Sequence, residues 1–266
     1  MMPSRAPQIH FATAEDGVRI AFADWGGDGP PLLWTPSWVS HIEMDLSNAD
    51  IAPLFQRLAA NHRFIHFDGR GTGLSARGVH DLTAAARTRD IAAVVDATGL
   101  ESFDLFAWSQ WGPPGIMYAA AHPDRVRNLA LYDTFASAFG IGDPRHLPEA
   151  LLGLIRAEWS IGSRTITEFV YPNIEHGLEK VFTDYFGASA SGEVAAAILE
   201  DGFFHADVTE LLPRLSMPTA VLHRRGDPAV LYEIGLRLAS LIPAARFIPL
   251  HGDIHVPWHG DVDEFL

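Results

Sequence analysis

The chain has 266 residues, and its 33 acidic and 19 basic side chains give a formal net charge of −14. Such an acidic chain argues against nucleic acid or an anionic membrane as a partner, because both select for clustered Lys and Arg. Because the chain contains no cysteine, it cannot form disulfides, thiolate nucleophiles or Cys-ligated metal sites. No signal-like apolar core opens the chain, and no apolar run approaches the roughly 18–20 residues that span a bilayer. We therefore expect a cytoplasmic protein.

Short apolar runs alternate with helical patterns over the first half of the chain. The first two runs, at 8–14 and 18–25, alternate between apolar and polar residues and predict an antiparallel pair. The later runs are short and almost wholly apolar, which is typical of buried parallel strands. We predict further strands at 31–35, 63–67, 103–107 and 126–132, with helices at 51–61, 87–98 and 109–121 between them.

The alternation stops between residues 135 and 212, where the sequence predicts helices alone. These helices are expected near 148–159, 165–171, 174–186, 192–203 and 208–215. The α/β pattern then resumes with a strand at 219–223, a helix at 231–241 and a strand at 245–250. The eight runs predict a mostly parallel α/β sheet with helices on both faces. We expect a core at 1–134 and 213–266, with a helical cap at 135–212 inserted above the strand ends.

Ser109 stands at the most abrupt change of pattern in the chain. The apolar run Phe103-Asp-Leu-Phe-Ala-Trp108 ends at this serine, and an Ala-rich helical stretch follows at once. A serine at a strand–turn–helix junction is typical of a nucleophile elbow, which lifts the hydroxyl above the sheet edge. The usual G-x-S-x-G pattern reads Ala107-Trp-Ser-Gln-Trp111 here. Trp111 at the second glycine predicts either a distorted, weakened elbow or smaller neighbours that admit the indole.

A nucleophilic serine needs a base within hydrogen-bond reach and an acid that orients this base. In this kind of fold the chain order is serine, acid, histidine, and each follows the C-terminal end of a strand. His255, after the last predicted strand, is the candidate base, with His251 as its nearest rival. Asp227 is the candidate acid, although its Gly-Asp-Pro triplet is also common in turns. Asp133, at the end of another strand, is the alternative acid.

The remaining site predictions concern the oxyanion and the substrate pocket. The main-chain N–H of Gln110, which follows the serine, and that of Trp38, in the loop after the third strand, are the expected oxyanion donors. Several bulky side chains lie in segments expected to border the pocket and favour an apolar substrate, although tryptophan often serves only in packing. These candidate pocket residues are Trp108, Trp111, His41, Trp159 and Trp258.

The sequence indicates neither a cofactor nor a metal. Gly69, Gly71 and Gly73 superficially suggest a phosphate loop, but the segment lacks the G-x-x-x-x-G-K-[ST] pattern. The scattered histidines include no H-x-x-x-H pair with an acidic third ligand. We therefore expect a small-molecule substrate as the partner, with a homodimer as an open alternative.

Two further motifs carry a resemblance to a known family. Asp68-x-Arg-Gly-x-Gly-x-Ser75 resembles the turn after the fourth strand of α/β-hydrolases, and His122-Pro-Asp-Arg-Val126 resembles the end of their nucleophile helix. The resemblance covers nearly the whole chain. Pro36–Glu43 and Gly252–Trp258 are similar to stand-alone hydrolases and to hydrolase-like domains fused to bacterial nucleotide cyclases or transcriptional regulators. The resemblance implies an α/β-hydrolase fold with a triad of Ser109, Asp227 and His255.

The expected activity is hydrolysis of an ester, lactone or thioester of an apolar small molecule through an acyl-enzyme. Two alternatives stay open at this point. The same triad could cleave a carbon–carbon bond, or the fold could serve as a small-molecule receptor without turnover. The fold itself does not decide among these, because it hosts many reactions.

Overall fold

The computed structural model describes residues 6–137, 146–172 and 178–266. Its centre is an eight-stranded sheet with the strand order β1-β2-β4-β3-β5-β6-β7-β8. The pairs β1–β2 and β2–β4 are antiparallel, and the other neighbours are parallel. The strands are β1 (Gln8–Thr13), β2 (Arg19–Asp24), β3 (Pro31–Trp34), β4 (Arg63–Phe67), β5 (Phe103–Trp108), β6 (Val126–Tyr132), β7 (Thr219–Arg224) and β8 (Arg246–Leu250).

Helices cover the sheet through two apolar cores. One core contains side chains of α3 (Ala84–Ala97), α4 (Gly112–Ala121) and α9 (Tyr232–Leu241). The other contains side chains of α2 (Ile51–Ala59) and the short α10 (Val262–Phe265). The central strands therefore bury both faces, which explains their nearly continuous apolar sequences. The predicted fold class, a mostly parallel α/β sheet with helices on both faces, is confirmed.

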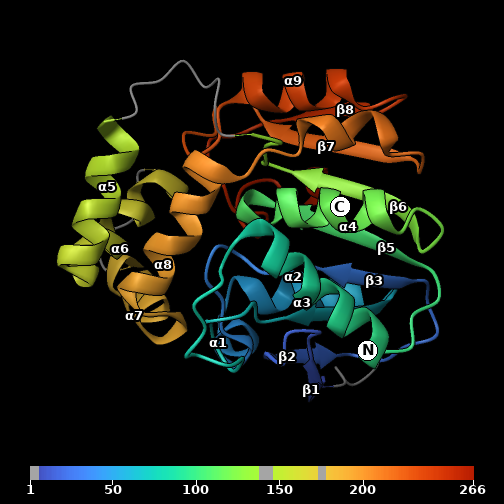
Figure 1. Cartoon of the computed structure of the whole chain (residues 1–266), viewed down its shortest axis with the longest axis horizontal. Coiled ribbons are helices and arrows are strands. Elements are labelled where there is room, and N and C mark those ends of the chain that lie inside the picture. Colours follow the sequence, from blue (N-terminus) through green and yellow to red (C-terminus); the bar gives the residue numbers. More distant parts are fainter. Residues whose placement is uncertain (1–5, 138–145, 173–177) are drawn as a thin grey trace.

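In the described part of the segment between β6 and β7, four α-helices gather at one end of the sheet (Figure 1), and we call them the cap helices. They are α5 (His146–Ala157), α6 (Trp159–Val170), α7 (Leu178–Ser189) and α8 (Gly192–Glu200). Hydrogen bonds join them to the core: Trp38 Nε1 donates to the carbonyl oxygen of Ala195 at 3.1 Å, and Gly73 N donates to that of Ser189 at 2.8 Å. These bonds hold the cap helices over the loops that follow β3 and β4.

The structure differs from the predicted elements mainly in helix boundaries. A short helix, α1 (Ile42–Ser47), was not predicted; it lacks a side-chain hydrogen bond at its N-cap, His41. The helix predicted from residue 109 begins with a 3-10 turn at Ser109–Trp111, so α4 starts only at Gly112. The helix predicted at 192–203 ends at Glu200 and continues as a π-helical turn. The predicted start of the helix at 174–186 lies outside the described residues.

Further boundary differences lie in the segment between β6 and β7. The helix predicted from 165 begins at Trp159, because the Glu158 side chain accepts a hydrogen bond from Ser160 N and so caps the new helix. A 3-10 helix, Thr209–Arg214, stands where a helix at 208–215 was predicted. Across the described ranges, no helix combines the length and apolarity needed to cross a bilayer.

Candidate active site

Ser109 lies on the 3-10 turn that joins β5 to α4, in a strained backbone conformation. Its φ is +49°, a value that non-glycine residues adopt only where the surrounding structure holds them there. Thr134 Oγ1 donates a hydrogen bond to the main-chain carbonyl of Ser109 at 2.6 Å. A Cβ on Gly112 would clash with that same Thr134 hydroxyl, and one on Gly115 would press on Ala107. The close approach that small residues permit therefore occurs at Gly112 and Gly115 rather than at position 111.

Three side chains from distant parts of the chain form a continuous line of hydrogen bonds. His255 Nε2 lies 2.8 Å from Ser109 Oγ, and His255 Nδ1 lies 2.7 Å from Asp227 Oδ2. Asp227 Oδ1 in turn accepts from the main-chain N–H groups of Ala229 at 2.8 Å and Val230 at 3.2 Å. All three side chains are buried. The imidazole is thus held at both nitrogens, with its Nε2 edge directed at the hydroxyl.

The environment of His255 favours its protonated form. Burial acts to lower the pKa of this imidazole, but the charge of Asp227 and the hydrogen bond to it outweigh burial, so the pKa is raised above its ordinary value. An imidazole that gains stabilisation on protonation is a stronger proton acceptor. The group can therefore take a proton from Ser109.

Asp133, the alternative acid, lies close to this line without joining it. Its Oδ1 accepts a hydrogen bond from Arg224 N at 2.8 Å, while the carboxylate that contacts His255 is that of Asp227. Burial and the neighbouring charge of Asp227 raise the pKa of Asp133 to about 8. Asp133 is consequently mostly protonated at neutral pH. Two buried carboxyl groups this close repel each other when both are charged, which contributes to the raised pKa of Asp133.

The same cluster is the place where the described residues could offer ligands to a metal. One ligand-type atom each from Asp133, Asp227 and His255 lies within 4.8 Å of the others. Of these three residues, Asp227 and His255 are already hydrogen-bonded to each other, and His255 also contacts Ser109.

His251, the alternative candidate for the base, lies apart from these residues. Its Nδ1 is 2.7 Å from Glu264 Oε1, and its side chain is 83% exposed.

The loop after β3 lies beside the elbow and is fastened to it by two indoles. Trp108 Nε1 donates to the carbonyl of Thr35 at 3.0 Å, and Trp111 Nε1 donates to the carbonyl of Ser37 at 3.2 Å. The carbonyl of Ser37 belongs to the same peptide group as the N–H of Trp38. Trp111 therefore fixes the plane of the peptide that carries one of the two expected oxyanion donors.

Trp111 fits without coming between Ser109 and His255. Its indole is buried and meets Phe67 edge-on, with ring centroids 5.2 Å apart. A Cβ on Gly69 would clash with the far edge of the indole, so the ring occupies space that only glycine leaves open there. Of the two outcomes predicted for this residue, the structure has the one in which a small neighbour admits the ring.

The glycine-rich segment that superficially suggested a phosphate loop forms an internal turn. Asp68 accepts hydrogen bonds from Ser40 Oγ at 2.7 Å, Ile42 N at 3.2 Å and Leu74 N at 2.8 Å. Gly73 has a φ of +48°, and a Cβ there would clash with the Asp68 carboxylate. The segment thus holds the loop after β3 in place through the hydrogen bonds that Asp68 accepts from Ser40 and Ile42.

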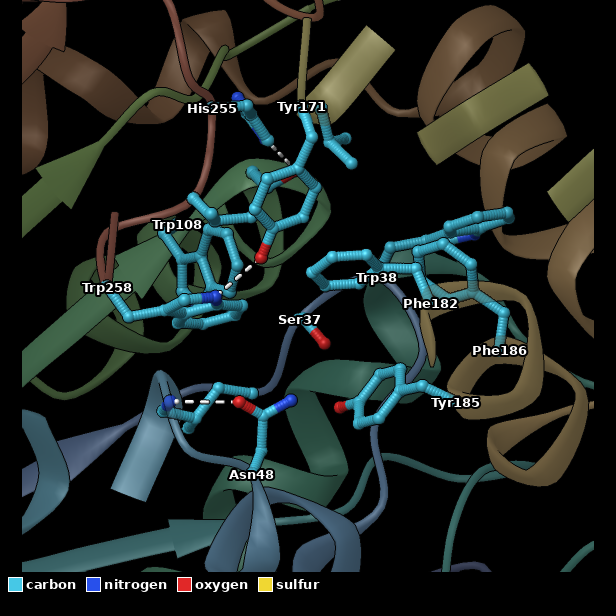
Figure 2. Close-up of a pocket in the computed structure, with 14 residues that line it drawn as sticks. Ser37, Trp38, Asn48, Trp108, Tyr171, Phe182, Tyr185, Phe186, His255 and Trp258 are labelled. Carbon is cyan, nitrogen blue, oxygen red and sulfur yellow. Dashed lines mark hydrogen bonds between the residues drawn. The ribbon is translucent and has the colours of Figure 1, made fainter. Parts of the chain in front are cut away.

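A cavity of about 50 Å³ is lined by Ser109 and His255. Figure 2 shows how the labelled residues of its wall, including His255, lie around it. Most of its wall is aromatic or aliphatic, and the cap helices supply a large part of it. Trp258 Nε1 donates to Tyr171 Oη at 2.6 Å and so joins the loop after β8 to the cap (Figure 2). The lining residues are Ser37, Trp38, Asn48, Ile51, Trp108, Ser109, Val170, Tyr171, Phe182, Tyr185, Phe186, His255, Val256 and Trp258.

The structure separates the five candidate pocket residues into two groups. Trp108 and Trp258 line the cavity and meet edge-to-face at 5.4 Å. Trp111, Trp159 and His41 are not among the residues that line the cavity. The Trp111 side chain donates to the carbonyl of Ser37, and His41 precedes α1. Trp159 packs against Trp38, and its Nε1 donates to the carbonyl of Ala190. They were nominated because their segments neighbour the site, but segment position does not determine which way a side chain points.

Sequence reasoning missed the cap and loop residues of the cavity wall. Three of these residues, Phe182, Tyr185 and Phe186, lie on α7 at positions i, i+3 and i+4. This spacing places them on one face of the helix, so helical periodicity was the signal that could have identified them. Tyr171 and Asn48 carried no such signal, because each lies at the end of a helix.

A family model described as alpha/beta hydrolase fold matches residues 34–156. The chain is 36% identical to a protein named carbamate hydrolase RutD from Azorhizobium caulinodans, but spans only 33% of its length. It is 26% identical to the bifunctional esterase/perhydrolase DCH of Acinetobacter calcoaceticus over 92% of both chains. Its structure is similar to that of the esterase EaEST from Exiguobacterium antarcticum, with a TM-score of 0.85 at 19% identity over 96% of this chain and 95% of that one.

The strand order and the similarity to the solved esterase show that the chain has the α/β-hydrolase fold. Over residues 34–156 the sequence is similar to the α/β-hydrolase family model.

Proposed function

We propose that this protein is a serine hydrolase that cleaves an ester of a small, largely apolar molecule. The observation that carries the proposal is the buried line of hydrogen bonds from Ser109 through His255 to Asp227, which ends at an apolar cavity. The similarity to relatives named as esterases supports the cleavage of an ester. A receptor without turnover would not require a serine hydroxyl directed at a buried imidazole, so this geometry favours an enzyme.

In the first half of the reaction, Ser109 Oγ attacks the ester carbonyl carbon while His255 Nε2 takes the hydroxyl proton. His255 then gives this proton to the departing alcohol as the carbon–oxygen bond breaks, which leaves an acyl-serine. Asp227 keeps the imidazole in the orientation that directs Nε2 at Ser109, and it stabilises the charged imidazolium. In the second half, water gives a proton to His255 and attacks the acyl carbon. The bond between this carbon and Ser109 Oγ then breaks, His255 returns the proton to Oγ, and the acid is released.

The developing oxyanion requires two hydrogen-bond donors held beside Ser109. We assign this role to the main-chain N–H groups of Gln110 and Trp38. Within the described part of the chain neither N–H is bonded to another loop residue, so both are available to a ligand. The bond from Trp111 Nε1 to the carbonyl of Ser37 supports the assignment, because it orients the Ser37–Trp38 peptide and makes its N–H a stronger donor.

Turnover of 4-nitrophenyl butyrate by the wild type and by Ser109→Ala tests the proposal. Loss of the nucleophile is expected to lower kcat by about 10⁴-fold or more. Ser240→Ala, which removes an exposed hydroxyl on α9, serves as the matched control and should retain wild-type activity. Thermal unfolding of all three proteins verifies that the fold is unchanged. Undiminished turnover by folded Ser109→Ala would exclude this mechanism.

A further inference from the structure

The cavity has one polar end, away from His255. Ser37, Asn48 and Tyr185 direct their polar atoms toward one another there (Figure 2). The rest of the described wall is mainly aromatic and aliphatic, and it contains neither Lys nor Arg. Since Ser109 and His255 line the same cavity, a molecule that reacts at Ser109 can extend toward these three side chains. We call Ser37, Asn48 and Tyr185 the distal subsite.

The orientation of the Asn48 amide is fixed by the main chain. Its Oδ1 accepts hydrogen bonds from Asp50 N at 2.8 Å and Ile51 N at 3.2 Å. The amide group of Asn48 has one acceptor atom, Oδ1, and one donor atom, Nδ2. Because the two main-chain N–H groups require an acceptor, Oδ1 must face them, and Nδ2 then points toward the cavity (Figure 2). Within the described part of the chain, Nδ2 has no acceptor. A fixed donor therefore faces the cavity.

The two hydroxyl groups of the distal subsite are already used as donors. Ser37 Oγ donates to the carbonyl of Val39 at 2.6 Å, and Tyr185 Oη donates to Asp45 Oδ1 at 2.8 Å. The N–H groups of Asn48 are thus the donors that a ligand must match, because a part-buried donor is costly to leave unpaired. An anionic group would lose its hydration here with no cation to compensate, so the fitting acceptor is uncharged.

We propose that the distal subsite recognises an uncharged carbonyl oxygen that the substrate carries away from the bond to be cleaved. Asn48 Nδ2 donates to this oxygen, while the surrounding aromatic wall holds the connecting apolar segment. The inference rests on the proposed function, since it takes Ser109 as the point where the substrate is cleaved. The substrate class is accordingly an ester with a second, neutral carbonyl group such as a ketone.

Two substrate series test the proposal. The first consists of 4-nitrophenyl alkanoates in which a ketone replaces one methylene at successive positions from carbon 5 to carbon 9. The second consists of acetate esters of alcohols with a ketone at the same positions, because either arm of the substrate could reach the distal subsite. Each keto ester is compared with the all-methylene ester of equal length. For the wild type, we expect one keto ester in one of the two series to have a kcat/KM about 3- to 10-fold higher than that of the all-methylene ester of equal length.

Asn48→Asp is the matched variant. It keeps an Oδ1 acceptor for Asp50 N and Ile51 N but replaces the donor that faces the cavity by an acceptor. We expect the ratio of kcat/KM for the keto ester over the methylene ester to fall to one or below. Asn48→Ser, which keeps a shorter acceptor for the turn, should reduce the ratio to about one. Asn61→Asp makes the same chemical change on an exposed side chain beyond α2 and should leave the ratio unaltered.

Each outcome bears on a different claim. If no keto ester in either series is preferred while turnover still depends on Ser109, the distal subsite does not recognise a carbonyl and the proposed function stands. A preference that is unchanged in both Asn48 variants would also overturn the assignment to Asn48. If instead turnover of both kinds of ester persists in Ser109→Ala, the proposed function itself fails.

Discussion

His255 Nε2 lies 2.8 Å from Ser109 Oγ, although the two residues are 146 positions apart in the sequence. The parallel sheet explains the proximity, because Ser109 follows the C-terminal end of β5 and His255 lies in the loop after β8. The loop of His255 is also held to the cap, since His255 N donates to the carbonyl of Val170 at 3.0 Å. Sheet, loop and cap thus determine the position of the imidazole together.

Replacing Asp227 by Asn should change both the rate and its pH dependence. Only neutral His255 can accept the serine proton, and its pKa is raised above the ordinary value by Asp227. Wild-type kcat/KM should therefore rise with pH through a midpoint above 6.5. In Asp227→Asn the midpoint should move to lower pH, while kcat falls by about 10⁴-fold. The measurement is a pH–rate profile with 4-nitrophenyl butyrate, and an unshifted midpoint would argue against Asp227 as the partner of His255.

Asp133→Asn should change how stability depends on pH. The folded-state pKa of Asp133, about 8, lies above its ordinary value of 3.8. Its contribution to stability is therefore intact below about pH 4 and is lost as the pH rises through 8. Over this pH range, the free energy of unfolding of the wild type should fall by on the order of a few kcal/mol relative to that of Asp133→Asn. Urea unfolding of both proteins at pH 4 to 9 measures the difference, and parallel curves would show that Asp133 ionises normally.

Trp111→Phe should weaken catalysis while preserving the fold. The phenyl ring retains much of the contact with Phe67 but loses the Nε1 donor that orients the Ser37–Trp38 peptide. Losing an oxyanion donor outright costs roughly 10²–10³ in kcat. Loosening one should lower kcat by about 10-fold with little change in KM. Trp25→Phe is the control, because Trp25 Nε1 has no partner in the described part of the chain. An equal loss in both variants would indicate a general packing effect.

Gly69 and Trp111 should be energetically coupled. Because Gly69→Ala places a methyl group against the edge of the indole, it should destabilise the wild type by about 1–3 kcal/mol. In a Trp111→Leu background the ring edge is absent, so the same substitution should cost much less. A double-mutant cycle measured by urea unfolding should give a coupling of about 1 kcal/mol or more. Additive effects would mean that glycine is required at position 69 for another reason.

The parts of the fold that the sequence predicted well depend on local patterns. Strands β4 and β6 begin and end at the predicted residues, because short apolar runs bounded by turns define buried strands. Ser109, Asp227 and His255 were nominated by their positions after strands, and the structure brings these three side chains together. Position after a strand is informative because parallel strands direct all these loops to one sheet edge.

The cavity wall depends on tertiary contacts and could not be predicted in the same way. Trp108 and Trp111 are three positions apart in the sequence, yet only Trp108 lines the cavity. The Trp111 side chain points away from the cavity, into the space that Gly69 leaves open. Asn48 owes its orientation to two main-chain N–H groups at the start of α2. Such orientations arise only when the loops, the cap and the sheet are assembled.

The most direct test of the central claim is covalent labelling of native protein with a fluorophosphonate, followed by peptide mass spectrometry. Only a serine activated by a neighbouring base displaces the fluoride at an appreciable rate. We expect one adduct per chain, on Ser109, with none in Ser109→Ala and a large loss of labelling rate in His255→Ala. An unlabelled native protein, or an adduct on another residue, would contradict the account.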